Sequence, residues 1–524
     1  MLDGSFSVAA AGVTESFNMA KAFFAILASM VALAGLVWVL GHSPNRPSGG
    51  PGETGDTDGG GPKNVTLFCA ASNRAVMEEV RQRYEAETGR RVSIQYGPSQ
   101  TLLSQIEIAR NGDLYLPADD SFLTIGREKG LIREVLNVAR MQAGLVVPKD
   151  NPKKLTSLDD VLKAQDLRIV QANPDAAAVA KLTRQILTES GKWEALHNAT
   201  TAYRTTVTDV VNDLLVGAAD VGIVYDAVLY PFPKLEFVSI PELEPANSQI
   251  ALGVLECTRQ PAAALHFARY VTAADRGLEQ YAGQGFTVSE GDKWADVPEL
   301  SVYAGSMLRP AIEDTVVAFE QREGVKVSRV YNGCGILVAQ MKAGQHPDAY
   351  FACDTEFMNQ VTDLFAESVN VSQNELVIVV QKGNPHNIAG LKDLGREGLR
   401  VGVGHEKQCA MGWITQNTFK EGGIQAEVMA NVTVQSPTGD MLVNQMLTGS
   451  LDAAVVYLSN AAGAGDKLDA VAIRDIDCST ATQPWAVAQQ SKYPNLAERL
   501  FEQICSAESQ EIFAAEGFRW QMAE

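Results

Sequence analysis

Short apolar runs alternate with helical stretches along most of the chain, and this pattern predicts an α/β fold. Residues 65–68 form an apolar run typical of a buried strand, and a helical pattern follows at 73–80. The alternation recurs with an apolar run at 143–148 and a helical pattern at 157–162. Because such βα units pair their strands side by side, the pattern predicts parallel sheets.

Two of the predicted strands end in a serine at the start of a helix. Ser72 follows the strand at 65–68, and Ser99 follows an alternating strand at 92–96. At the carboxyl ends of neighbouring strands, the two hydroxyls and several free backbone N–H groups would point at one spot. This geometry suits a small anion. The alternative interpretation is that both serines are ordinary helix N-caps.

Most of the chain is an internal repeat. The segments 67–72, 112–119, 222–225 and 285–286 recur in the same order at 302–306, 347–354, 454–457 and 517–518. Copies of roughly 230 residues are large enough for two lobes each. The repeat predicts tandem modules at 64–292 and 299–524, each built of two doubly wound lobes joined by a hinge.

The amino-terminal part has a different composition. After a segment at 1–21 without a clear pattern, residues 22–40 carry no charge, and a helix of this length nearly spans a bilayer core of about 30 Å. We expect a transmembrane anchor at 22–41. A cleaved signal sequence is the alternative, although Gly41-His42-Ser43 does not resemble an Ala-x-Ala cleavage site. Residues 42–63, rich in Gly and Pro and with almost no apolar residue, predict a flexible linker.

The charge balance excludes some partners. The chain has 43 Lys and Arg against 63 Asp and Glu, a formal net charge of −20, which argues against nucleic acid or an anionic membrane surface as a partner. It does not exclude a bound anion, since N–H groups, hydroxyls and helix dipoles hold oxyanions without Lys or Arg. The seven cysteines are too sparse for a disulfide scaffold, and their odd number leaves at least one thiol unpaired within the chain.

Taken together, four motifs resemble the periplasmic molybdate-binding proteins of ABC importers. These motifs are Ala70-Ala71-Ser72, Ser99-Gln100-Thr101-Leu102, Gly112-Asp113-Leu114-Tyr115 and Gly222-Ile223-Val224-Tyr225. The resemblance implies a two-lobed, type II solute-binding protein that closes on molybdate or tungstate outside the cytoplasmic membrane, with no enzymatic activity and no cofactor. The ABC permease and ATPase would be separate chains, because the sequence has no GxxxxGK[ST] loop and only one hydrophobic span.

The resemblance also implies which residues hold the ligand in the first module. The donors would be the hydroxyls of Ser72, Ser99 and Tyr225, together with the backbone N–H groups of Val179 and Val207 at two helix starts. We expect Asp113 and Asp119 to be structural residues of turns rather than catalytic acids.

The second module departs from this pattern. It places Ser306 and Tyr457 in corresponding segments, but Cys334 stands where the first module has Ser99. Met411 and Gly439 stand at the two helix starts. Because a thiol is a poor hydrogen-bond donor, we expect weaker oxyanion binding there.

Several interpretations of the second module and of the whole protein are open. The second module could be a structural partner without a ligand or could bind a different oxyanion or solute. It could also use Cys334, Cys409 and His405 as soft metal ligands or a redox pair. A cysteine-dependent enzyme, with Cys334 as nucleophile and His405 as base, is the alternative from a different class. The protein could also sense its oxyanion rather than deliver it to an importer.

Overall fold

The computed structural model describes residues 64–522. The expected membrane anchor at 22–41 and linker at 42–63 lie outside this range. Within it, no helix combines the length and the apolar character that crossing a bilayer requires.

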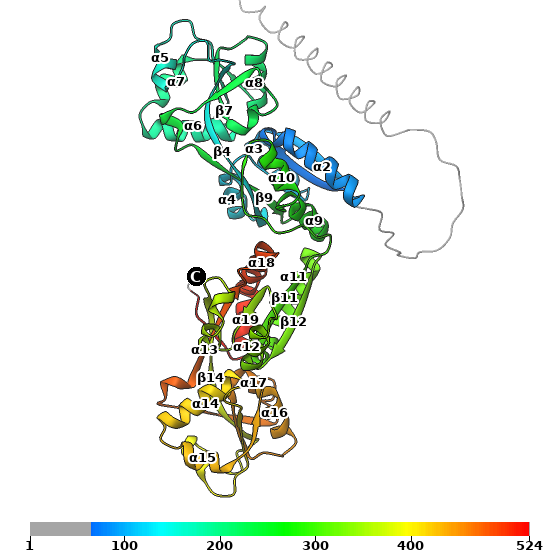
Figure 1. The fold of residues 1–524 in the computed structure, drawn as a ribbon, viewed down its shortest axis with the longest axis vertical. Coiled ribbons are helices and arrows are strands. Elements are labelled where there is room, and N and C mark those ends of the chain that lie inside the picture. The colour runs from blue at the N-terminus through cyan, green and yellow to red at the C-terminus, as the bar shows by residue number, and fades with distance from the viewer. Residues whose placement is uncertain (1–63, 523–524) are drawn as a thin grey trace, which may run out of the picture. The chain divides into compact units, whose positions relative to one another are not determined.

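Module 1 is organised around a mixed sheet with strand order β2-β1-β3-β9-β4-β7-β5-β6 (Figure 1). Its strands are β1 (Val65–Ala70), β2 (Val92–Gly97), β3 (Leu114–Leu116), β4 (Ile132–Pro148), β5 (Ile169–Ala172), β6 (Thr200–Arg204), β7 (Val221–Tyr225), β8 (Leu235–Val238), β9 (Asn247–Leu255) and β10 (Thr287–Val288). Its helices are η1 (Ala71–Asn73), α2 (Arg74–Thr88), α3 (Ser99–Ala109), α4 (Ser121–Glu128), α5 (Leu158–Lys163), α6 (Ala178–Glu189), α7 (Trp193–Ala199), α8 (Val207–Leu215), η2 (Asp226–Leu229), η3 (Pro241–Leu243), α9 (Pro261–Val271) and α10 (Gly277–Gly283).

The long strand β4 belongs to both lobes of module 1. Residues 132–142 pair with β9, whereas residues 143–148 pair with β7 and β8. Lobe A therefore contains β1, β2, β3, β9, β10 and the first part of β4, and lobe B contains β5 to β8 and the rest of β4. Figure 1 shows β4 running from the lobe that carries α2, α3 and α4 into the lobe that carries α5 to α8.

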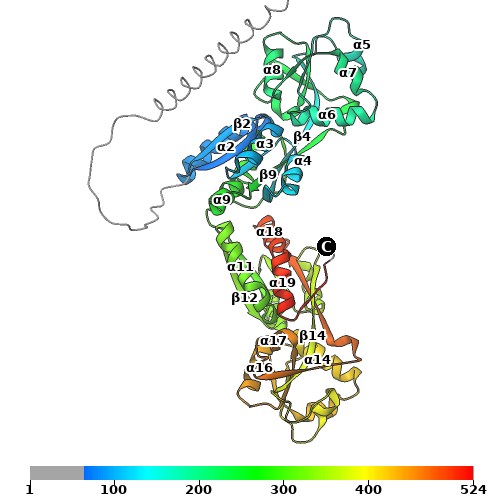
Figure 2. The same ribbon diagram turned by 180° about the vertical axis from the view of Figure 1, so that it is seen from behind.

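Module 2 repeats this architecture, with strand order β12-β11-β13-β19-β14-β17-β15-β16 and β14 as the shared strand (Figure 2). Its strands are β11 (Glu299–Gly305), β12 (Lys326–Asn332), β13 (Ala349–Phe351), β14 (Val369–Gln381), β15 (Val401–Gly404), β16 (Val432–Ser436), β17 (Ala453–Tyr457), β18 (Leu468–Ala472), β19 (Thr480–Val487) and β20 (Arg519–Trp520). Its helices are η4 (Ser306–Leu308), α11 (Arg309–Glu323), α12 (Cys334–Lys342), α13 (Thr355–Asn359), η5 (Thr362–Leu364), η6 (Leu391–Gly395), α14 (Ala410–Glu421), α15 (Gln425–Asn431), α16 (Gly439–Leu447), α17 (Leu458–Ala462), η7 (Asp477–Ser479), α18 (Pro494–Ile504) and α19 (Ala507–Ala515).

The prediction of parallel sheets is only partly right. β1 pairs in parallel with β2 and β3, and β5 pairs in parallel with β6 and β7. The crossover strands β4 and β9 run antiparallel to each other and to their neighbours in both lobes. The reason is the path of the chain, since β4 carries it from lobe A into lobe B and β9 returns it to lobe A after the whole of lobe B, so that these two strands run in opposite directions.

Central strands bury both faces, which explains their continuous apolar runs. All five residues of β7 are buried, because helices cover the sheet on each side. The carboxyl ends of β1, β2 and β7 each lead directly into a helix or turn at η1, α3 or η2. These chain reversals place the ends of the strands and the starts of the helices together, as ligand sites in open α/β sheets require.

An ion pair joins the starts of β5 and β7 in lobe B. The Arg168 guanidinium donates to the Asp220 carboxylate through Nε at 3.0 Å and Nη2 at 2.9 Å, and the Arg168 backbone N–H also donates to it. Module 2 repeats the arrangement with Arg400 and Asp452. The hydrogen bonds from Arg168 lower the pKa of Asp220 to about 2, against the opposing effect of burial.

We expect Asp220→Asn to destabilise the protein at neutral pH by about 1–2 kcal/mol, after allowance for the half-exposed Arg168. A depressed carboxylate pKa gives stability that is present above the unfolded pKa and is lost as pH falls toward the folded value of about 2. Denaturant unfolding of the parent and the variant should therefore differ at pH 7 and converge between about pH 4 and pH 2. Asp466→Asn, at an exposed site, is the control, and a difference that did not change with pH would contradict the assignment.

Candidate functional site

The five residues predicted to hold a ligand in module 1 surround one small hollow between its lobes. Ser72 and Ser99 come from lobe A, and Val179, Val207 and Tyr225 come from lobe B. The remaining lining residues are Ala70, Ala71, Gly97, Pro98, Ala118, Ala177, Ala178 and Thr206. Segments up to 155 residues apart in the chain (70 to 225) thus meet at this site.

Ser99 is the first residue of α3 and is buried. Its Oγ accepts a hydrogen bond from the backbone N–H of Ala118 at 3.1 Å, and its carbonyl accepts one from the Tyr115 hydroxyl at 2.8 Å. The N-cap of α3 is Pro98, so Ser99 does not cap the helix. Since the Ser99 oxygen already accepts, its hydroxyl proton remains available for donation into the hollow.

Ser72 lies in η1, immediately after β1. Its side chain makes no capping hydrogen bond, so the N-cap interpretation does not hold for this serine either. The Asn73 amide donates to Ser72 Oγ at 3.4 Å, and the Tyr281 hydroxyl donates to Asn73 Oδ1 at 3.1 Å. Tyr281, in α10, therefore orients this corner through the Asn73 side chain. The sequence pointed to neither residue, because nothing in the local pattern connects positions 208 residues apart.

The backbone donors come from the first turns of two helices. Val179 is the second residue of α6 and Val207 is the first of α8. N–H groups in a first helical turn have no partner within the helix, and the helix dipole makes this end positive. The Thr206 Oγ accepts from the Asp209 N–H, and the Asp209 carboxylate accepts from the Thr206 N–H. This capping box fixes the start of α8 and leaves the Val207 N–H free to bind.

Tyr225 ends β7 and is fully buried, yet its hydroxyl has no hydrogen-bond partner among residues 64–522. The adjacent Ser248 hydroxyl donates to the Ala118 carbonyl or to the Asp119 carboxylate instead. Burial raises the pKa of Tyr225 far above its ordinary value, and Asp119 acts in the same direction. The phenol therefore stays protonated and can only gain by donating to an acceptor inside the hollow.

No charged side chain lines the hollow. The nearby Asp119 does not line the hollow. Its Oδ1 accepts from the Ser121 N–H, and its Oδ2 lies 3.0 Å from Ser248 Oγ, whose single proton goes either to this carboxylate or to the Ala118 carbonyl. Asp113 likewise accepts from the Thr66 N–H, as a structural acid. The site is therefore a set of neutral donors.

The two lobes of module 1 touch beside the hollow. The Gln100 N–H at the start of α3 donates to the Ala176 carbonyl just before α6, at 3.3 Å. The structure thus shows the two lobes of module 1 in contact, with the donors of both lobes around the same hollow.

Module 2 differs from module 1 by more than the sequence suggested. β1 and β3 pair Cys69 with Leu116, and β11 and β13 pair Ala304 with Phe351, which sets an offset of 235 residues (304 − 69). At that offset Ser306 corresponds to Ala71, and Met307 corresponds to Ser72. The assumed equivalence of Ser306 with Ser72 was wrong by one residue, because strand pairing, rather than the shared small-residue motif, fixes the register.

A disulfide occupies the place of the second serine. Cys334 stands at the position of Ser99 and is bonded to Cys353, which stands at the position of Ala118. The Cys353 N–H points at Cys334 Sγ at 3.0 Å, just as the Ala118 N–H donates to Ser99 Oγ. Gly305 makes room for the bond, since a Cβ there would lie 2.2 Å from Cys353 Sγ. Module 2 therefore lacks both serine hydroxyls.

The other candidates of module 2 keep their positions. Met411 lies in the first turn of α14, Gly439 begins α16, and the buried Tyr457 hydroxyl has no partner among residues 64–522. The Asn460 side chain fills the space beside Gly439.

Cys334, Cys409 and His405 do not form a metal or redox site in this structure. The Cys334 sulfur is bonded to Cys353, and Cys409 Sγ lies 3.6 Å from the carbonyl oxygens of His405 and Ser436. Burial raises the pKa of Cys409 to about 11. Within 64–522, no group of three or more His, Cys, Asp or Glu side chains is placed to hold a metal ion. Cys334, being oxidised, also has no thiol to serve as a nucleophile.

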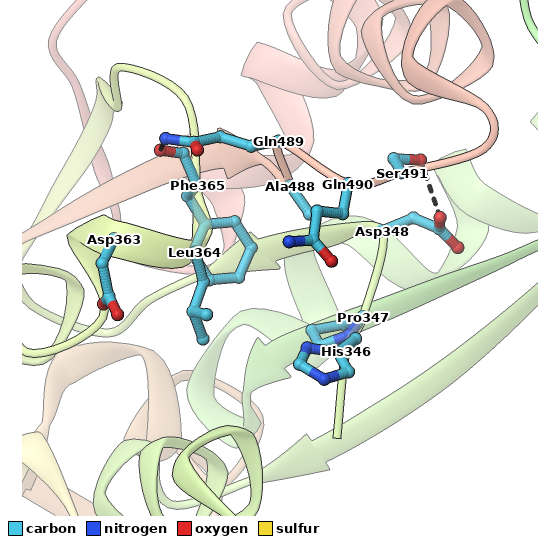
Figure 3. A pocket seen from close by; sticks show the side chains of 10 residues that line it. All are labelled: His346, Pro347, Asp348, Asp363, Leu364, Phe365, Ala488, Gln489, Gln490 and Ser491. Carbon is cyan, nitrogen blue, oxygen red and sulfur yellow. Dashed lines mark hydrogen bonds between the residues drawn. The ribbon is translucent and has the colours of Figure 1, made fainter. Parts of the chain in front are cut away.

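Module 2 has a second hollow, which lies at the amino end of β13 (Figure 3). It is lined by Asp348, which precedes β13, and by Ser491, whose hydroxyl donates to the Asp348 carboxylate at 2.7 Å. Asp348 also accepts from the Ser301 N–H. Because this hollow is at the amino end of β13, it lies at the opposite end of that strand from Cys353, which is in the part of module 2 that corresponds to the oxyanion site.

The chain belongs to the family described as bacterial extracellular solute-binding protein, whose model matches residues 65–287 and again 300–519. Members of this family bind substrates and are not enzymes, which supports a binding function here.

Individual relatives match one module at a time. The chain is 27% identical over 224 residues to a putative binding protein of Haemophilus influenzae, covering 42% of this chain and 90% of the relative. It is 28% identical over 221 residues to the molybdate-binding protein ModA of Mycobacterium tuberculosis, covering 41% and 83%. The periplasmic molybdate-binding protein of Azotobacter vinelandii is 18% identical in a structural match with a TM-score of 0.38 that covers 43% of this chain and all of that protein.

Proposed function

We propose that module 1 captures molybdate or tungstate outside the cytoplasmic membrane and presents it to an ABC importer. One observation carries the proposal: five donors from two lobes converge on a single hollow with no charged lining residue. A fully deprotonated tetrahedral dianion accepts hydrogen bonds on every oxygen, and hydrogen bonds to ionised groups are roughly twice as strong as neutral ones.

The donor set also supports discrimination against protonated anions. Hydrogen phosphate must donate its own proton, but no carboxylate lines the hollow and Ser99 Oγ already accepts one hydrogen bond, from the Ala118 N–H. A ligand hydroxyl in this site would find only neutral hydroxyl oxygens as acceptors and no carboxylate, so its hydrogen bond would be a weaker one than the charge-assisted bonds made by a dianion. The size of the hollow would then separate molybdate and tungstate from the smaller sulfate.

The similarity to proteins named molybdate-binding protein ModA supports the same ligand class. As a receptor of this kind, the protein would work with an ABC permease and ATPase encoded as separate chains, held near them by the apolar segment 22–40.

Titration calorimetry of the full chain with molybdate, tungstate, sulfate and phosphate tests the proposal. We expect one equivalent of molybdate or tungstate to bind, sulfate to bind at least tenfold more weakly, and phosphate not to compete. Equal affinity for sulfate and molybdate would refute the specificity, and the absence of binding by any of the four would refute the oxyanion site.

A further inference from the structure

Three charged side chains, those of Lys192, Asp159 and Glu242, form a cluster in lobe B of module 1. Lys192, the N-cap of α7, donates to the Glu242 carboxylate at 3.0 Å and lies 3.6 Å from Asp159. Glu242 also accepts from the Leu158 N–H at 3.3 Å. The cluster thereby joins the starts of α5 and α7 to η3.

Module 2 has the same backbone at this place but different side chains. Gly191 and Gly423, both with positive φ, precede Lys192 and Ile424, the N-caps of α7 and α15. Ile424 therefore replaces the lysine at the centre of the ion cluster. At the start of the neighbouring helix, where Leu158 and Leu391 correspond, Lys392 replaces Asp159.

A hollow of about 450 Å³ lies at this place in module 2. Its apolar lining comes from η6, the start of α15 and the segment that begins in β18, with Leu391, Ile424, Val471, Ile473 and Ile476 as the aliphatic members. None of these residues belongs to the part of module 2 that corresponds to the oxyanion site.

Two cations stand at the edge of this hollow. Lys392 and Arg474 both line it, both are exposed, and neither forms an ion pair among residues 64–522. The one acid in the lining, Asp393, accepts hydrogen bonds from the backbone N–H groups of Ala389 and Gly390 at 2.7 and 3.2 Å. In a protein with a net charge of −20, two unpaired cations beside an apolar hollow form a local anion-attracting site.

We propose that this hollow binds a small amphipathic carboxylate, with the apolar body against the aliphatic lining and the carboxylate at Lys392 and Arg474. A volume of about 450 Å³ lies within the range of roughly 300–1,000 Å³ for small-molecule pockets. The binding is independent of oxyanion capture by module 1, so the protein is a receptor for two chemically different solutes.

Photoaffinity labelling of the full chain with a diazirine derivative of decanoic acid locates the site. We expect labelled peptides to contain residues 389–393 and 471–476, and unlabelled decanoate to prevent the labelling. Decanol and decyltrimethylammonium, which have the apolar chain without the carboxylate, should compete at least tenfold more weakly. Labelling confined to other segments, or equal competition by decanol, would overturn the proposal.

Two variants test the two halves of the site. Lys392→Glu combined with Arg474→Glu should weaken decanoate competition at least tenfold. Gly422→Trp should abolish labelling, because a side chain at Gly422 points toward Ile424 and Ile476, at 3.5 and 3.3 Å from its Cβ. Lys342→Glu combined with Lys492→Glu, at two exposed lysines outside the lining, is the matched charge control and should change nothing.

Oxyanion titration of the same variants separates this proposal from the one for module 1. We expect unchanged molybdate binding in all of them, because they lie outside module 1. Far-UV circular dichroism and thermal unfolding like those of the parent protein show that module 2 is folded. Decanoate labelling that persisted in Gly422→Trp would refute the site, whatever the outcome of the molybdate titration.

Discussion

Ser99→Ala should weaken molybdate binding by tenfold to more than a hundredfold. The substitution removes one donor from a buried charged ligand, and hydrogen bonds to charged groups contribute about 1.5–3 kcal/mol. At about 1.4 kcal/mol per tenfold change, this range gives the expected loss. The dissociation constant from titration calorimetry is the measurement.

The control for this prediction lies on the same helix. Thr101→Ala removes a hydroxyl from the exposed face of α3 and should leave the affinity unchanged. Ser99→Ala also leaves the Ala118 N–H without an acceptor, so some loss of stability is expected with it. Ser99→Thr, which keeps a hydroxyl, should recover part of the affinity. An affinity unaffected by Ser99→Ala would show that Ser99 holds Ala118 in place and does not contact the ligand.

Much of the fold and the first site follows from the sequence, because local signals there agree with the tertiary structure. The serine corners, the two helix starts and Tyr225 each sit at the end of an element that hydrophobic patterning reveals. Their convergence depends on parallel strands that present their carboxyl ends together. The antiparallel crossover strands could not be predicted this way, since the pairing partners of β4 change within a single strand.

The second site shows what local patterns leave undetermined. The motif Gly305-Ser306 resembles Ala71-Ser72, but the pairing of β11 with β13 shifts it by one residue. The pairing of Cys334 with Cys353 among seven cysteines depends on how α12 and the end of β13 meet in space. The repeat indicates this disulfide once module 1 is known, because Ser99 and Ala118 contact each other there and both positions are cysteine in module 2.

Module 2 supplies no serine hydroxyl where module 1 has two, so we expect one equivalent of oxyanion for the unmodified protein. Restoring the donors requires Met307→Ser and Cys334→Ser, with Cys353→Ala to remove the remaining thiol. This triple variant reproduces the residue types of Ser72, Ser99 and Ala118 and should bind a second equivalent. The stoichiometry of molybdate binding is the measurement.

Cys334→Ser with Cys353→Ala alone is the matched control for the triple variant. It removes the disulfide but keeps the buried Met307, whose thioether cannot donate a hydrogen bond, so we expect it to remain at one equivalent. One equivalent in the triple variant would assign the remaining block to lobe B, where Met411 stands at one helix start and the Asn460 side chain fills the space beside Gly439. Two equivalents in the unmodified protein would refute the premise that a disulfide and a thioether cannot replace the serine donors.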